Sequence, residues 1–309
     1  VMDTFRLPFG EWVEAIVDFI GVVFGWLFDA ISVVLGVVYE ALDWVLITPP
    51  FWVIILVFAA LAWWIKGWKL AVGTALGLLF IVLVDQWDNA MDTLALVLVA
   101  SAIAVIISVP TGIWAARNDT VSRLVRPVLD FLQTMPAFVY LIPAIIFFGV
   151  GVVPGMIATI LFALAPGVRL TELGIRGVDA EVVEAGQAFG ATRGRILRQI
   201  QLPLALPSIM AGVNQVIMLS LSMVVIAGIV GAGGLGGEIT RAIGRINVGL
   251  GFEAGVAIVI LAMMLDRMTS ALADKGGARA KRRKKTSPDN STKDTQASAE
   301  TAQPAGAQA

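Results

Sequence analysis

The chain of 309 residues contains no cysteine and no histidine. Without these side chains it cannot form a disulfide, a thiolate nucleophile, a Ser-His triad or a His-based metal site. Charged residues are also scarce, at 15%, whereas soluble domains have about a quarter. The composition therefore excludes a disulfide scaffold, a collagen-like chain and a disordered chain.

Hydrophobic residues make up 58% of the chain, and the mean hydropathy is +0.87. A soluble globule of this length could not bury so many apolar side chains. Long apolar runs without strand-like alternation instead predict an all-α membrane protein. We expect a bundle of seven transmembrane helices, at about residues 50–66, 70–84, 92–114, 128–148, 153–171, 208–230 and 253–272.

The positions of Lys and Arg predict how the bundle is oriented, because basic residues in short loops stay in the cytoplasm. Three alternate loops and the end of the last span are basic, and the opposite loops carry carboxylates, except for a modestly basic stretch at 231–252. We therefore expect the N-terminus outside and the C-terminus in the cytoplasm. The net charge of −1 then results from an acidic outer side that cancels a basic inner side.

An amphipathic segment precedes the first expected span. At 100° per residue its carboxylates fall within an arc of about 80°, and Trp12, Trp26 and Trp44 lie beside this arc. We expect residues 1–48 to form one or two helices on the outer membrane surface, with carboxylates toward water. A spanning helix whose carboxylates face a protein interior is the alternative. The carboxylates are those of Glu11, Glu14, Asp18, Asp29, Glu40 and Asp43.

The C-terminal segment 276–309 differs from the rest of the chain. It begins with a basic run at 281–285 and continues in Ser, Thr, Asn, Gln, Ala and Pro with few hydrophobic residues. This composition predicts a disordered cytoplasmic tail. The basic run either binds anionic lipid or only fixes the topology.

The longest internal loop, at about 172–207, is cytoplasmic in this topology and is not apolar. Its sequence resembles the EAA loop of bacterial ABC importer permeases, which reads E-A-A, three residues, G, nine residues, I, one residue, L-P. The spacing is complete, and the only departure is Gly in place of the second Ala. The matching residues are Glu184, Ala185, Gly186, Gly190, Ile200, Leu202 and Pro203.

The residues of this loop predict two short helices. Residues 182–189 favour a helix, Gly190 permits a sharp turn, and 191–201 favour a second helix that Pro203 ends. Small residues at 185 and 186 allow close packing against another surface. Such a helix-turn-helix could dock in a groove of a soluble partner. The resemblance implies that this partner is the ATPase subunit, whose closure the loop transmits to the spans.

Two further segments, 132–149 and 231–236, look like the permease subunit of importers for glycine betaine, proline betaine and related osmolytes. The resemblance covers most of residues 50–272 and implies a type I ABC importer permease fold in the bacterial inner membrane. It also implies a homodimer with two ATPase subunits, which bind ATP-Mg, and an external substrate-binding protein. Lipid surrounds such a subunit, which binds no cofactor or nucleic acid and performs no bond chemistry.

Residues Gly231 to Gly236 match the pattern G-x-G-x-x-G. A dinucleotide site would need this pattern after a strand and before a helix, but here it follows a predicted membrane span. We expect the glycines to allow close backbone packing at the pore mouth or to cap a re-entrant turn. The chain has no G-x-x-x-x-G-K-[ST] motif, so the ATP site must lie on another polypeptide.

A quaternary ammonium substrate carries a diffuse positive charge that aromatic faces attract. Phe138 and Tyr140 in the fourth expected span, and Asn214, Met218 and Ser222 in the sixth, are candidates for the translocation path. Asn214 and Ser222 are eight residues apart, close to one helix face. The alternative for the polar residues is hydrogen bonding between helices.

Other functions stay open at this point. The loop motif fits permeases for trimethylamine N-oxide, choline, methionine or a sulfonate equally well. A secondary transporter would be expected to carry ionisable residues buried in its spans for ion coupling, and we find none deep in a span. A membrane enzyme is disfavoured because no convergent set of catalytic side chains is evident.

Overall fold

The structure, a computed structural model, describes residues 7–285 as backbone, and the side chains of 7–272 apart from that of Tyr140. Every regular element in this part of the chain is a helix, as predicted. The elements are α1 (Phe9–Ile47), α2 (Phe51–Lys66), α3 (Trp68–Leu83), α4 (Trp87–Arg117), α5 (Asp119–Thr134), α6 (Ala137–Phe148), α7 (Val152–Arg176), α8 (Ala180–Ala188), α9 (Arg193–Ile196), the π-helical η2 (Leu197–Gln201), α10 (Leu202–Ile229), α11 (Gly234–Arg245) and α12 (Val248–Lys285).

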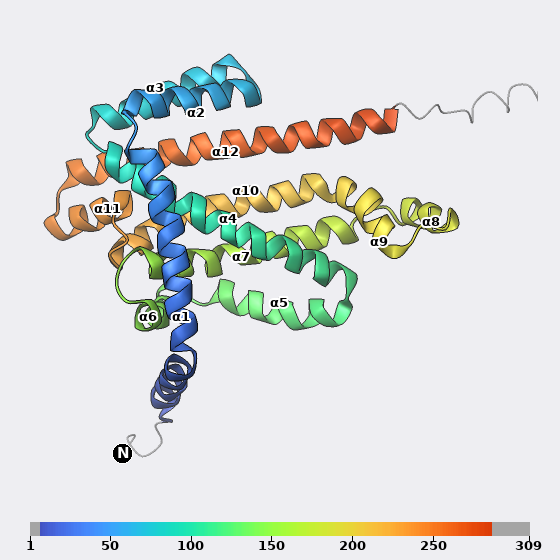
Figure 1. Cartoon of the computed structure of the whole chain (residues 1–309), viewed down its shortest axis with the longest axis horizontal. Helices are drawn as coiled ribbons and strands as arrows, with labels where there is room; N and C mark the ends of the chain where they lie inside the picture. The colour runs from blue at the N-terminus through green and yellow to red at the C-terminus, as the bar shows by residue number, and fades with distance from the viewer. Residues whose placement is uncertain (1–6, 286–309) are drawn as a thin grey trace, which may run out of the picture.

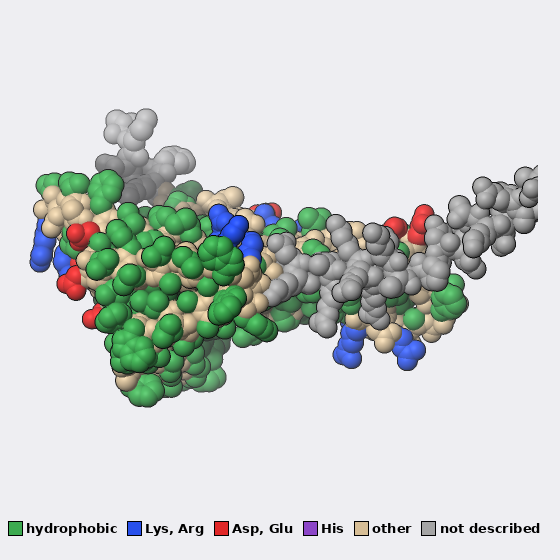
Figure 2. All heavy atoms as spheres, turned by 90° about the horizontal axis from the view of Figure 1, so that it is seen from above, with side chains coloured by type: hydrophobic (Ala, Val, Ile, Leu, Met, Phe, Trp, Pro, Cys, Tyr) green, Lys and Arg blue, Asp and Glu red, His purple; other side chains and the backbone are tan. Residues whose placement is uncertain are grey.

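Four expected spans are continuous helices: α4, α7, α10 and α12 each contain a segment long and apolar enough to cross a membrane. They run side by side in Figure 1, with α7 packed against both α4 and α10. Figure 2 shows hydrophobic side chains over most of the visible broad part of the molecule. Such a surface is suited to a lipid environment rather than to water.

Small residues bring the central helices close together. A Cβ added at Gly167 of α7 would lie 2.3 Å from the Ser108 hydroxyl oxygen of α4, and one added at Gly155 would lie 2.8 Å from the Cβ of Ala227 on α10. Because lipid provides no hydrophobic drive for one helix to join another, close packing of this kind holds membrane helices together. The core therefore lies where α4, α7 and α10 meet.

The expected span at 128–148 is not a single helix. The chain breaks into α5 and α6, whose axes differ by 98°. Pro136 follows Met135, which has the extended conformation (φ −70°, ψ 132°) that a residue before proline prefers. The apolar pattern concealed this break because both helices contribute hydrophobic residues to it.

The first two expected spans form a hairpin of two 16-residue helices, α2 and α3, joined at Gly67 with φ +98°. In Figure 1 the hairpin lies alongside α12, which it contacts. A helix of this length rises about 24 Å, less than the hydrocarbon thickness of about 30 Å. Whether each helix crosses the membrane stays a prediction.

The N-terminal amphipathic segment is a single helix of 39 residues, α1. Figure 1 shows that α1 runs across the direction of the bundle helices. Its packed face includes Leu35 and Leu46, which are buried, and Phe28, which stacks on Phe147 at 4.4 Å. The three Trp side chains on α1 are exposed. By length and composition α1 is also long enough to span a membrane.

Helix α12 extends to Lys285, so residues 276–285 are helical rather than disordered. Ala, Lys and Arg, which are strong helix formers, dominate this stretch and extend the helix past the apolar span. The remainder of the expected tail, 286–309, lies outside the described residues.

Candidate functional site

The loop between α7 and α10 forms a small helical hairpin at one end of the bundle, opposite to α6 and α11 (Figure 1). Its first helix, α8, begins where the Asp179 carboxylate accepts a hydrogen bond from the Glu181 amide at 3.2 Å. It ends at Ala188, and Gly190 follows with φ +75°. The Gly190 amide donates to the Gln187 carbonyl at 2.8 Å and the Ala191 amide to the Gly186 carbonyl at 3.1 Å. This is a Schellman helix end, so the predicted turn at Gly190 is present.

The three residues of the E-A-A position face different ways. Glu184 and Ala185 are exposed, whereas Gly186 is half-buried against the second arm of the loop. A Cβ added at Gly186 would lie 2.7 Å from the terminal methyl of Ile200 and 3.6 Å from Ile196. The small residue therefore allows packing within the loop itself, a contact that the spacing alone did not identify.

The second helix of the loop, which begins at Arg193, does not end where the sequence predicts. Pro203 does not terminate a short helix, because α9, η2 and α10 form one helical course from Arg193 to Ile229. In the π-helical η2 segment the Leu202 amide donates to the Leu197 carbonyl, five residues back. The wider π turn precedes proline, which has no amide hydrogen and would otherwise disrupt an α-helical ladder. The second part of the loop is thus continuous with α10 in one helical course.

The outer surface of this hairpin is open. None of the described side chains on α8 is buried, and Phe189 is 92% exposed. The basic side chains of Arg193, Arg195 and Arg198 are also exposed. An exposed aromatic ring beside charged residues, at the end of a short helix, is typical of a surface that docks with another protein.

A polar cluster next to this loop was missed by the sequence analysis. The Glu172 carboxylate, 6% exposed, accepts hydrogen bonds from the Ser122 hydroxyl at 2.7 Å and from Arg126 at 2.9 Å. It also pairs with the Arg176 Nε at 3.0 Å, and the Arg176 guanidinium reaches Asp119 at 2.7 Å. The spacing of Glu172 and Arg176 could have suggested their pairing, but the contacts with α5 depend on tertiary structure.

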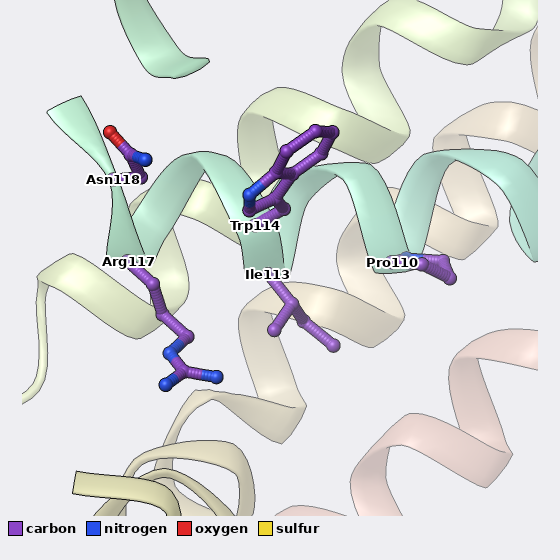
Figure 3. A pocket seen from close by; sticks show the side chains of 5 residues that line it. All are labelled: Pro110, Ile113, Trp114, Arg117 and Asn118. Carbon is purple, nitrogen blue, oxygen red and sulfur yellow. The ribbon is translucent and has the colours of Figure 1, made fainter. Parts of the chain in front are cut away.

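A surface hollow of about 460 Å³ lies at the end of α4 (Figure 3). It is lined by Pro110, Ile113, Trp114, Arg117 and Asn118. The Asn118 side chain also begins α5, since its Oδ1 accepts from the Thr120 amide at 2.9 Å. Figure 3 shows Arg117 and Ile113 extending from the same side of α4. All five residues come from one helix and its cap, so the hollow lacks the converging polar groups of a substrate site.

The three path candidates on α10 do not share a face. Met218 and Ser222 are exposed, and the Ser222 hydroxyl donates to the Met218 carbonyl at 3.0 Å. Asn214 instead faces α12, where its Nδ2 donates to Asp266 at 3.0 Å and its Oδ1 accepts from Thr269 at 2.5 Å. Asn214 therefore acts in hydrogen bonding between helices, the alternative that the sequence left open. Asp266 is an ionisable residue of α12 that the sequence analysis did not weigh.

The aromatic candidates belong to α6. Phe138 is more than half exposed, while the side chain of Tyr140 lies outside the described residues. Leu141, one turn along α6, is buried and belongs to a core cluster with Met223 of α10. This packing leaves the Phe138 face of α6 available for contact with lipid, substrate or a second copy.

The glycine-rich segment at 231–236 leads into α11. Gly231, Gly233 and Gly234 have φ of +84°, +74° and +59°, and the Leu235 amide donates to the Thr93 hydroxyl at 2.8 Å. A Cβ added at Gly236 would lie 2.1 Å from the Val224 carbonyl oxygen of α10. As expected, the glycines allow close backbone packing, and the described residues around them contain no strand of a dinucleotide-binding unit.

Comparison with known proteins agrees with this architecture. The chain is 48% identical over 264 residues to the glycine betaine transport system permease protein OpuAB of Bacillus subtilis (strain 168), covering 85% of this chain and 94% of that protein. It is 44% identical over 286 residues to the glycine betaine/proline betaine transport system permease protein ProW of Escherichia coli (strain K12), covering 92% of this chain and 81% of that protein.

The fold matches a solved transporter. An inward-facing structure of the MetNI methionine ABC transporter superposes with a TM-score of 0.57 at 22% identity, covering 62% of this chain and 95% of that chain. Residues 108–275 match the family model of the binding-protein-dependent transport system inner membrane component. This region contains α5 to α11, most of α12 and the whole loop between α7 and α10. The chain belongs to the family of binding-protein-dependent transport system inner membrane components and has the fold of an ABC transporter permease.

Proposed function

We propose that this chain is the permease subunit of an ATP-driven importer for glycine betaine or a related quaternary ammonium osmolyte. The observation that carries the proposal is the exposed helix α8, which presents Glu184 and Ala185, together with exposed Phe189 between this helix and the Schellman turn at Gly190. Two relatives that are glycine betaine permeases by name, at 48% and 44% identity, support the substrate class.

The α8–α9 hairpin docks in a groove of a separate ATPase and transmits its movement into the spans. Because α9 continues through η2 into α10, a displacement of the hairpin by the ATPase also displaces α10. Two copies of the chain, two ATPase subunits carrying ATP-Mg, and an external substrate-binding protein make up the transporter. The chain itself binds no cofactor and catalyses no bond chemistry.

The hairpin faces the cytoplasm, so α6 and α11, at the opposite end of the bundle in Figure 1, face outward. Helix α1 lies in the outer membrane interface with its Trp side chains among the lipid headgroups. This orientation places the N-terminus outside and the C-terminus in the cytoplasm. The direction of α1 across the bundle helices in Figure 1 supports its placement along the membrane surface.

The substrate passes between two copies, along surfaces that include Phe138 of α6 and Met218 and Ser222 of α10. The exposure of these residues supports the assignment. The aromatic face of Phe138 attracts a quaternary ammonium group through its quadrupole. A relative named for trimethylamine N-oxide transport, from Ruegeria pomeroyi, is 39% identical, so this compound is the competing substrate to test.

The test reconstitutes the permease with its ATPase and binding protein in liposomes and measures uptake of labelled glycine betaine. We expect ATP-dependent uptake that excess unlabelled glycine betaine suppresses and methionine does not. Charge reversal by Glu184→Lys should reduce uptake about ten-fold or more while the permease remains folded, because it places a cation on the docking face.

Normal uptake by the Glu184→Lys variant would overturn the coupling role of α8. Suppression by trimethylamine N-oxide at lower concentration than by glycine betaine would reassign the substrate. Glu181→Lys is the matched variant, since Glu181 is also exposed and lies three residues from Glu184 on the same helix face. A smaller loss of uptake than with Glu184→Lys would assign the docking contact to the E-A-A position, and an equal loss would show that the contact is not specific to Glu184.

A further inference from the structure

Three helices meet at an ionic cluster that surrounds one buried carboxylate, one turn before the α7–α10 loop. The cluster comprises Asp119, Ser122 and Arg126 of α5 and Glu172 and Arg176 of α7. The Arg176 guanidinium also donates to the Ala115 carbonyl near the end of α4, at 2.8 Å. We call this set the Glu172 cluster. It links the ends of α4 and α5 to the end of α7 through one carboxylate.

The geometry of the cluster makes it stiff. A single oxygen, Glu172 Oε1, is 2.7 Å from the Ser122 hydroxyl, 2.9 Å from Arg126 and 3.0 Å from Arg176. The Glu172 side chain is only 6% exposed, so water competes weakly for these bonds. Charge-assisted hydrogen bonds that are shielded from water are stronger than exposed ones.

The position of the cluster connects it to α8. Arg176 is the last residue of α7, and only residues 177–179 separate it from α8. Helix α7 is also tightly packed against α4 and α10 at this end. A Cβ added at Gly112 of α4 would lie 2.6 Å from the Cβ of Thr171, and one added at Gly174 of α7 would lie 2.7 Å from the Cβ of Ser208 on α10. A displacement of α8 therefore reaches the Glu172 cluster through only three residues of chain.

Helix α5 connects the Glu172 cluster to α6. This helix runs beside α7 in Figure 1 and leads to the sharp break before α6, the helix that carries Phe138. Away from the cluster, α5 contacts α7 through a small apolar group that includes Leu129 and Val168 and through the exposed pair of Asp130 and Arg169. Farther from the loop, the Gln133 Nε2 donates to the Phe162 carbonyl at 2.9 Å. Glu172 is therefore the buried carboxylate among the ion pairs that attach α5 to α7, since Asp119 and Asp130 are exposed.

We propose that Glu172 is a positioning residue that makes α5 move with α7, so that movement of α8 reaches α6 as well as α10. The inference rests on the proposed coupling role of α8. In this arrangement α10 is driven directly through η2, and the α5–α6 pair is driven through the Glu172 carboxylate. Both routes must be intact for ATP hydrolysis to produce transport.

The experiment uses the complete transporter in liposomes, with ATP hydrolysis and glycine betaine uptake measured in the same sample. Glu172→Gln preserves shape and removes the charge. We expect the variant to assemble and to hydrolyse ATP in response to the binding protein, with uptake per ATP about ten-fold lower than in the wild type. Hydrogen exchange should become faster in α5 and remain unchanged in α8.

The matched control is Asp130→Asn. It breaks an ion pair between the same two helices, but both partners are exposed, at 64% for Asp130 and 44% for Arg169. Exposed pairs contribute little, so uptake per ATP should stay within two-fold of the wild type. Glu172→Asp retains the charge and should recover part of the coupling.

If Glu172→Gln fails to assemble, Arg126→Gln is the second variant. It removes the charged partner of Glu172 at a side chain that is 60% exposed, and it should also lower uptake per ATP. Wild-type uptake per ATP in the assembled variant would overturn the inference. Glu184→Lys separates the two proposals. If it uncouples transport and Glu172→Gln does not, only the Glu172 inference fails. If Glu184→Lys transports normally, the coupling role of α8 fails.

Discussion

At the scale of single residues, glycines decide how closely the helices of this protein approach one another. Gly236 of α11 lies against the backbone of Val224 on α10, and Gly167 of α7 lies against Ser108 of α4. A backbone neighbour cannot move aside in the way the end of a flexible side chain can. The Gly236 contact is therefore less tolerant of a side chain than most positions in the structure.

This difference can be tested with two adjacent glycines. Gly236→Ala places a methyl group 2.1 Å from the Val224 carbonyl oxygen, and we expect it to destabilise the folded permease by about 1–3 kcal/mol, as overpacking does. A Cβ at Gly237 meets nothing within 4 Å, so Gly237→Ala should be neutral or stabilising, since Ala favours a helix.

The measurement for this pair is thermal unfolding of the purified protein in one detergent. Equal midpoints for the Gly236 and Gly237 variants would show that α11 does not pack on α10 as described.

At the scale of elements, α8 depends on its two caps. The helix has only nine residues, too few to be stable alone in water, and its described side chains are not buried. The Asp179 cap at its start, the Schellman turn at Gly190 and the contact of Gly186 with Ile200 therefore hold it in place. Weakening one of these should loosen α8 without unfolding the bundle.

Gly190→Ala tests this dependence. A left-handed conformation costs a residue with a Cβ about 1–2 kcal/mol, so hydrogen exchange in α8 should become about ten-fold faster while exchange in α7 and α10 stays the same. Gly194→Ala is the control, because Gly194 lies in α9 with open space around it. Unchanged exchange in α8 after Gly190→Ala would contradict the role of this turn.

At the scale of the whole molecule, the proposed orientation has a direct test because the chain has no cysteine. Ala188→Cys on α8 and Ile243→Cys on α11 introduce single thiols at exposed positions at opposite ends of the bundle. In intact cells that lack the ATPase, a membrane-impermeant maleimide should label the Ile243→Cys protein at least ten-fold faster than the Ala188→Cys protein.

Inside-out vesicles should reverse this preference, and disrupted membranes should label both proteins. Labelling of Ala188→Cys from outside intact cells would place α8 on the outer side and remove the basis for its contact with an ATPase.

Local chemistry made part of this protein predictable from its sequence. The apolar runs predicted the helices α4, α7, α10 and α12, because spanning a bilayer requires continuous hydrophobic segments with internally paired backbones. The turn at Gly190 and the resemblance of segment 184–203 to a coupling loop were also readable, since both depend on residue type and close spacing. These features led to the correct family.

Contacts between distant segments decided the rest. Glu172 meets Ser122 and Arg126, 50 and 46 residues away, and Asn214 turns toward Asp266, 52 residues away, so neither partnership is visible in local patterns. The same holds for the break between α5 and α6 and for the helix that continues past Pro203. Both depend on how neighbouring segments pair the backbone N–H and C=O groups that proline leaves without a partner. Sequence alone determined that the chain spans a membrane and carries a loop that resembles the EAA motif, because hydrophobicity and short-range spacing are local properties. Tertiary structure decided which buried charge links the loop to the helices, because that link exists only where three helix ends converge.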